Sequence, residues 1–146
     1  MLYETGNDWK NASNKRISLL GMSGVGKTFL ANSLRKTKKW FHYSVDYRIG
    51  TKYLGEEIVD NFKKEAMKLP VLRDHLLNDS IYISSNITFD NLSPLSEYLG
   101  KPGASEQGGM PFNEYLSRQR KHLMAEINST VDTKLFAEKS SEIYGY

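Results

Sequence analysis

Residues 21–28 fit the phosphate-binding pattern G-x-x-x-x-G-K-[ST], and no other stretch constrains the fold of this chain as strongly. The pattern works where a strand runs into a loop and the loop opens a helix. A short apolar run at 16–20 precedes it, and residues 29–35 follow it with Leu30 and Leu34 on one helical face. The flanks therefore predict a strand, a loop and a helix. The predicted phosphate-binding residues are Gly21, Met22, Ser23, Gly24, Val25, Gly26, Lys27 and Thr28.

The residue types in this stretch predict a nucleotide site. Glycines let the loop backbone turn so that its N–H groups converge on phosphate oxygens. The start of the following helix adds unpaired N–H groups and the positive end of the helix dipole. Lys27 can reach the β- and γ-phosphates, and the Thr28 hydroxyl can ligate Mg²⁺. We therefore expect ATP and Mg²⁺ as cofactors.

The match makes the chain resemble the P-loop NTPase superfamily. That resemblance implies an α/β fold of three layers, with a mostly parallel sheet flanked by helices. We expect residues 16–146 to form this domain after a polar lead-in at 1–15. Strands are predicted at 16–20, 40–45 and 80–84, from their aromatic and β-branched residues. Such sheets usually have five strands, so we expect that the chain is incomplete at its C-terminus or that the domain is a reduced one.

A second informative segment follows the predicted strand at 40–45. Ligands of open α/β sheets bind beyond the carboxyl ends of the strands, so Asp46 and Arg48 are expected on the side of the loop. Asp46 can orient or deprotonate an acceptor hydroxyl, and Arg48 can clamp an anionic group. This order resembles small-molecule kinases of the shikimate kinase and dephospho-CoA kinase type. The alternatives are a cap or turn role for Asp46 and a surface ion pair for Arg48.

A Gly-rich segment at 100–111 predicts a lid, because such segments inside compact domains are often functional. Arg118 and Arg120 follow it on a predicted helix that Pro111 opens. In shikimate kinase-like enzymes lid-region arginines approach the transferring phosphoryl group, so the resemblance implies a catalytic role for one of them. The alternative is a solvated basic helix face. Asp90 ends a short run and is a candidate magnesium ligand, with a turn or cap as the alternative.

Composition excludes several other classes of protein. The chain has no cysteine, so it has neither disulfides nor a thiolate nucleophile. No apolar run reaches the ~20 residues of a membrane span, and no signal peptide is evident. The net charge of +3 is too small to indicate a nucleic-acid partner. We therefore expect a cytoplasmic protein with no membrane partner.

Together these features predict a phosphotransferase that moves the ATP γ-phosphate to a small anionic metabolite. Lys27, Asp46, Arg118 and Arg120 would be its catalytic residues, and Asp46 and Arg48 would bind the acceptor. Two alternatives are an ATPase coupled to a partner and a regulatory module that binds nucleotide without catalysis. A GTPase is disfavoured because no Asn-Lys-x-Asp segment is present.

Overall fold

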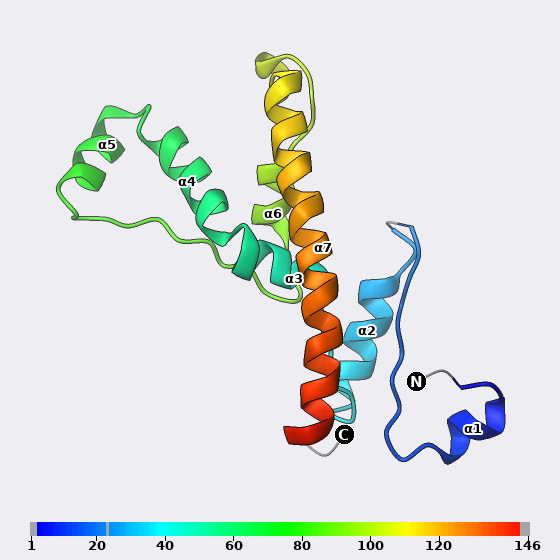
Figure 1. Cartoon of the computed structure of the whole chain (residues 1–146). Helices are drawn as coiled ribbons and strands as arrows, with labels where there is room; N and C mark the ends of the chain where they lie inside the picture. Colours follow the sequence, from blue (N-terminus) through cyan, green and yellow to red (C-terminus); the bar gives the residue numbers. More distant parts are fainter. Residues whose placement is uncertain (1–2, 23, 144–146) are drawn as a thin grey trace. The chain divides into compact units, whose positions relative to one another are not determined.

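The computed structural model describes residues 3–22 and 24–143, with side chains described as far as residue 132. Helices are its only regular elements in these residues (Figure 1). They are α1 (Gly6–Asn11), α2 (Lys27–Lys36), α3 (Val45–Arg48), a π-helical turn (Ile49–Tyr53), α4 (Gly55–Ala66), α5 (Pro70–Leu77), α6 (Ser93–Leu99), a 3₁₀ turn (Ser105–Gln107) and α7 (Phe112–Ile143).

The predicted α/β fold is wrong. Within 3–22 and 24–143 there is no β-strand, and a single isolated bridge joins Pro102 to Met110. Without a parallel sheet the chain cannot have the three-layer architecture of P-loop NTPases. The predicted membership of that superfamily, and of its small-molecule kinases, is therefore not supported.

Local capping explains why a helix begins at Val45, the last residue of the second predicted strand. The Ser44 hydroxyl accepts a hydrogen bond from the Tyr47 N–H at 3.2 Å and so caps α3. The aromatic run before Val45 therefore leads into a helix instead of into a strand end. Asp46 and Arg48 consequently lie on α3.

The predicted helix after the Gly-rich loop and the predicted helix that Pro111 opens are confirmed, as α2 and α7. α2 follows the Gly-rich loop as expected, although it ends at Lys36, and Lys38 has a φ of 59° that a helix cannot accommodate. Pro70 occupies the first turn of α5, where its missing N–H costs nothing. Gly100 terminates α6 with a φ of 56°.

The chain divides into two compact units. The first unit comprises Met1–Tyr43 with Asp132–Tyr146, and the second comprises Ser44–Val131. In the first unit Trp9 of α1 stacks on Trp40 with ring centroids 6.2 Å apart. Neither α1 nor α2 contains a buried residue, so the core lies elsewhere.

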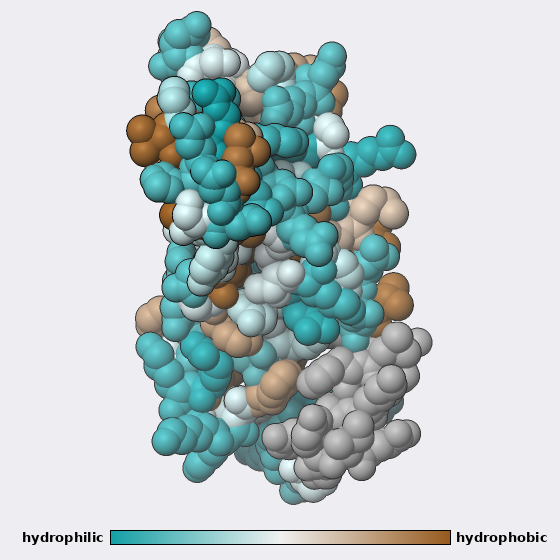
Figure 2. Space-filling view, turned by 90° about the vertical axis from the view of Figure 1, so that its left-hand side faces the viewer, coloured by the Kyte–Doolittle hydropathy of each residue, from teal (hydrophilic) through white to brown (hydrophobic). Residues whose placement is uncertain are grey.

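The second unit contains the core. Its buried apolar residues are Ile49, Leu54, Ile58, Ile87, Leu95, Tyr98 and Ala125. The π-helical turn and α6 approach closely at Gly50, where a Cβ atom would lie 2.9 Å from Ile87 Cδ1 and 3.6 Å from Leu95 Cβ. This core is small, and Figure 2 shows separate brown apolar patches on a mostly teal surface. Exposed apolar side chains such as Phe29 and Tyr82 are therefore a general feature of the chain.

The Gly-rich segment forms a closed turn in the second unit. The Gly103 N–H donates to the Met110 carbonyl at 3.1 Å, and the Met110 N–H donates to the Lys101 carbonyl at 3.0 Å. A Cβ atom on Gly109 would lie 2.6 Å from the Gly103 backbone. Glycine is thus required here for a close backbone approach. Lid motion of this segment stays a prediction.

Candidate functional site

The loop between residue 20 and α2 has the backbone conformation that its glycines allow. Gly24 and Gly26 have φ values of 81° and 89°, in the left-handed region that other residues avoid. A Cβ atom on either would meet no atom within 4 Å, so the constraint is conformational and not steric crowding. Ser23, one of the predicted phosphate-binding residues, lies outside the described residues.

Lys27 closes this loop. It is the first residue of α2, and its ammonium donates hydrogen bonds to the carbonyls of Gly21 at 2.8 Å and Met22 at 2.6 Å. The side chain thus bridges back over five and six positions of the chain. The two backbone carbonyls that hold the ammonium are neutral acceptors. An anionic acceptor forms stronger hydrogen bonds with an ammonium and can replace them.

The start of α2 is electropositive. Gly26 caps it without a side-chain hydrogen bond, and its first turn contains no acidic residue. The first N–H groups of a helix have no partner within the helix, so those of Lys27 and Thr28 are directed outwards. The dipole of the ten-residue helix adds positive potential at the same end. Loop, lysine and helix start together supply hydrogen-bond donors and positive potential, which is the chemistry that anion binding at a helix start requires.

The other predicted site residues belong to the second unit. The sheet edge that was expected to group them with the loop is absent from the part of the chain that the structure describes. Asp46 is exposed in the first turn of α3, where its carboxylate complements the helix dipole. Asp90 lies in a tight turn, and its N–H donates to the Thr88 hydroxyl at 3.3 Å. No cluster of three metal-ligating side chains occurs among the described residues.

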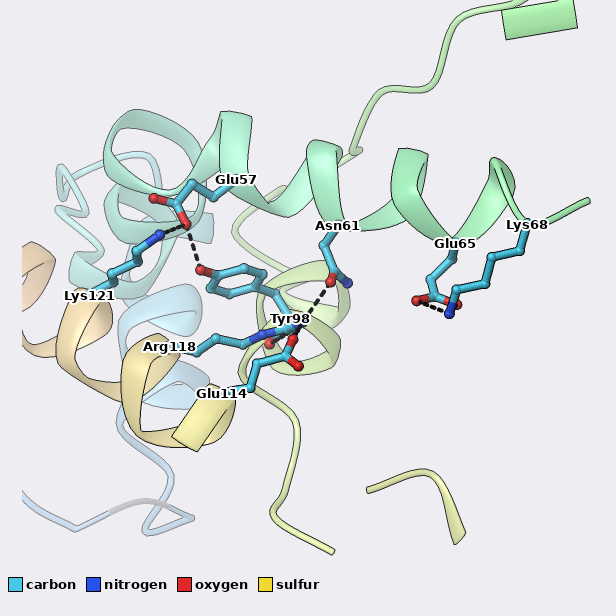
Figure 3. Close-up of polar contacts among 8 residues, drawn as sticks. All are labelled: Glu57, Asn61, Glu65, Lys68, Tyr98, Glu114, Arg118 and Lys121. Carbon is cyan, nitrogen blue, oxygen red and sulfur yellow. Dashed lines mark hydrogen bonds and ion pairs between the residues drawn. The ribbon is translucent and has the colours of Figure 1, made fainter. Parts of the chain in front are cut away.

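Arg118 is part of a polar cluster that joins α4, α6 and α7 (Figure 3). Its guanidinium donates to the Tyr98 carbonyl at 2.5 Å and to Asn61 Oδ1 at 2.7 Å, and it pairs with Glu114. The guanidinium carbon also lies 4.8 Å from the centroid of the Tyr98 ring. The Arg118 side chain is only 14% exposed. Its observed contacts are therefore structural.

Glu57 organises the other half of the cluster. One carboxylate oxygen accepts hydrogen bonds from the Tyr98 hydroxyl at 2.7 Å and from the Lys121 ammonium at 2.5 Å. The hydrogen bond from Lys121 lowers the pKa of Glu57 below its usual value, although desolvation opposes it. Burial raises the pKa of Tyr98, and the hydrogen bond to the Glu57 carboxylate raises it further. The contacts of the cluster therefore favour the ionised form of Glu57 and the neutral form of Tyr98.

We expect Glu57→Gln to reduce stability at pH 7 and to have no effect in acid. Glu57 has a lowered pKa in the folded chain, so its contribution is present above the unfolded value of 4.5 and disappears as the pH falls through the folded value. Because the carboxylate is 40% exposed, the loss at pH 7 is about 0.2–1 kcal/mol. Denaturant unfolding of both proteins at pH 7 and pH 3 measures it. An equal difference at both pH values would contradict the assignment.

Arg120 differs from Arg118 in exposure and in contacts, although the sequence predicts the same role for both. Arg120 is exposed and lines a groove of about 450 Å³ together with Tyr53, Lys121 and Met124. No hydrogen bond or ion pair joins its guanidinium to another described residue. The only signal of this difference in the sequence is Glu114, four positions before Arg118, because helical residues at that spacing pair.

Comparison with known proteins does not extend this description. The chain matches no family model, no curated protein and no solved structure. Among the described residues, no helix has the length and apolar character needed to cross a membrane.

Proposed function

We propose that residues 21–28 bind the triphosphate of ATP together with Mg²⁺, and that the chain acts as a nucleotide-binding module. The observation that carries this proposal is Lys27, which starts α2 and reaches back to the carbonyls of Gly21 and Met22. A closed loop with a lysine at its mouth and a helix start beneath it concentrates donors for phosphate.

The residues present suit both parts of the ligand. Backbone N–H groups of the loop and of the first turn of α2 would bind phosphate oxygens, and Lys27 would neutralise their charge. The Thr28 hydroxyl is a hard oxygen ligand of the type that Mg²⁺ accepts. Gly24 and Gly26 place no side chain at these two positions of the loop, so a ligand can approach their backbone.

Phosphoryl transfer to a small anionic metabolite is the second candidate function. The observation that favours it is the groove lined by Arg120, whose exposed guanidinium offers positive charge to an acceptor, whereas the neighbouring Lys121 is paired with Glu57. The roles that the sequence predicts for Asp46 and Arg48 in acceptor binding, and for Asp90 as a magnesium ligand, stay predictions, because they depended on a sheet that is absent from the described residues. Hydrolysis coupled to a partner would need neither the groove nor an acceptor.

Calorimetric titration of ATP–Mg²⁺ and GTP–Mg²⁺ into the full chain tests the proposed binding. We expect ATP binding that depends on Mg²⁺. Phosphate release is then measured without an acceptor and with a panel of anionic metabolites. Absence of release in both assays supports a binding module, acceptor-dependent ADP formation supports transfer, and absence of ATP binding overturns the proposal.

Gly26→Ala is expected to cost about 1 kcal/mol of stability and to weaken ATP binding. Alanine at a φ of 89° is strained by about 1–2 kcal/mol, and relief of that strain would move the start of α2. Gly6→Ala is the matched control, because Gly6 has open space for a Cβ atom and no positive φ. Thermal unfolding and the titration above measure both effects. Unchanged affinity in Gly26→Ala would contradict the assigned role of this backbone conformation.

A further inference from the structure

Residues 82–90 have the burial pattern of a β-strand although they form none. Every even-numbered residue from Tyr82 to Asp90 is exposed, and every odd-numbered residue from Ile83 to Phe89 is partly or fully buried. Tyr82 is 87% exposed, whereas Ile87 is 8% exposed and belongs to the core of the second unit. Alternation with a period of two is the pattern of an extended backbone with one face on a core. Figure 1 shows the segment as an extended coil between α5 and α6.

Part of the backbone of this segment has N–H and C=O groups that are not used in hydrogen bonds with other described residues. The N–H and C=O groups of residues 81–85 make no hydrogen bond with other described residues. A row of such groups on an extended segment is a template on which another strand can pair. The segment therefore resembles an edge strand.

The composition of the segment favours pairing with itself. Residues 80–89 read Ser-Ile-Tyr-Ile-Ser-Ser-Asn-Ile-Thr-Phe and contain no charge, proline or glycine. Edge strands of sheets are usually protected from association by lysine, by proline or by a bulge. Residues 80–89 contain neither lysine nor proline. Isoleucine, tyrosine and threonine are strong strand formers. Two copies of an uncharged segment can approach without like-charge repulsion, and Asp79 and Asp90 limit the length that can do so.

We propose that this chain forms a dimer in which residues 81–87 of two copies pair as antiparallel strands. A twofold axis between the strands requires that the even-numbered residues of both copies share one face of the ribbon. The odd-numbered residues of both copies then lie on the other face of the ribbon. There the odd-numbered residues of each copy still pack against the core of their own chain. The midpoint of the paired residues 81–87 places the axis at Ser84, so Tyr82 lies opposite Asn86 of the second copy.

Sedimentation of the full chain across 1–300 μM tests the proposed association. We expect a monomer–dimer equilibrium. Consecutive N–H groups of a strand point to opposite edges, so Ser84→Pro or Ser85→Pro removes one that faces the second copy. At least one of these variants should raise the dissociation constant tenfold or more, while Ser84→Ala leaves it unchanged. A monomer at all concentrations, including one that binds only other proteins, would overturn the proposal.

Single cysteines test the register, because the natural chain has none. Ser84→Cys should form a disulfide-linked dimer under mild oxidation, since residues at the axis have Cα atoms about 4.5–5.5 Å apart. Asn86→Cys is the control, because its two copies would lie four residues apart along the strands, about 13 Å. A mixture of Tyr82→Cys and Asn86→Cys should give the mixed disulfide. Equal linking of Asn86→Cys and Ser84→Cys would overturn the antiparallel pairing.

Discussion

Replacement of Lys27 by alanine is expected to weaken ATP–Mg²⁺ binding by about 10- to 100-fold. The ammonium is the only side-chain charge that the structure holds against the loop carbonyls of residues 21 and 22 within the described residues. A hydrogen bond to a charged group contributes about 1.5–3 kcal/mol, and 1.4 kcal/mol corresponds to a factor of ten in affinity. Calorimetric titration of the wild type and the variant measures the loss.

Lys36→Ala provides the control for this experiment. Lys36 is in the last turn of the same helix, where a cation complements the dipole but lies far from the helix start. Both variants remove one positive charge, so a general electrostatic effect would weaken binding equally in the two. We expect Lys36→Ala to change affinity less than about twofold. Equal losses in the two variants would contradict a specific role for Lys27.

Arg118→Ala is expected to destabilise the second unit by about 2–3 kcal/mol. The change leaves the Tyr98 carbonyl and Asn61 without their partner, and it removes the cation from the Tyr98 ring. Loss of a charged, largely buried donor has this magnitude, reduced here because Glu114 is 48% exposed. Denaturant unfolding measures the change in the free energy of unfolding.

Arg120→Ala on the same helix separates structure from function. It removes an exposed guanidinium without a partner among the described residues, so stability should change by less than about 0.5 kcal/mol. If the second candidate function holds, Arg120→Ala lowers acceptor-dependent ADP formation in a folded protein. Equal destabilisation by both variants would contradict the structural role that the contacts give Arg118.

Features that depend on neighbouring residues could be predicted from the sequence. The loop with its glycines and the helix that Lys27 begins need only local chemistry, as do Pro70 at the start of α5 and Gly100 at the end of α6. The sequence therefore predicts the helix that Lys27 begins and the loop conformation of Gly24 and Gly26, but it does not predict that Lys27 reaches back to Gly21.

Features that depend on distant partners could not be predicted. A strand needs a neighbour for its backbone groups, and the run at 80–84 has strand residues but no ladder within the described residues. Its extended form was predictable, whereas its isolation was not. Arg118 likewise has a partner 57 residues away, Asn61, which no pattern in the sequence indicates. The expected grouping of Asp46 and Arg48 with the loop depended on the missing sheet.

The two carbonyl contacts of Lys27 also affect which ligands the loop should prefer. In the free protein, the carbonyls of Gly21 and Met22 compete with any incoming anion for the same ammonium. A ligand must supply enough negative charge to displace this internal competitor. Two or three linked phosphates do so better than one, because they engage the ammonium and the helix start at the same time. The loop is thus expected to select for chain length, with ATP and ADP favoured over AMP and inorganic phosphate.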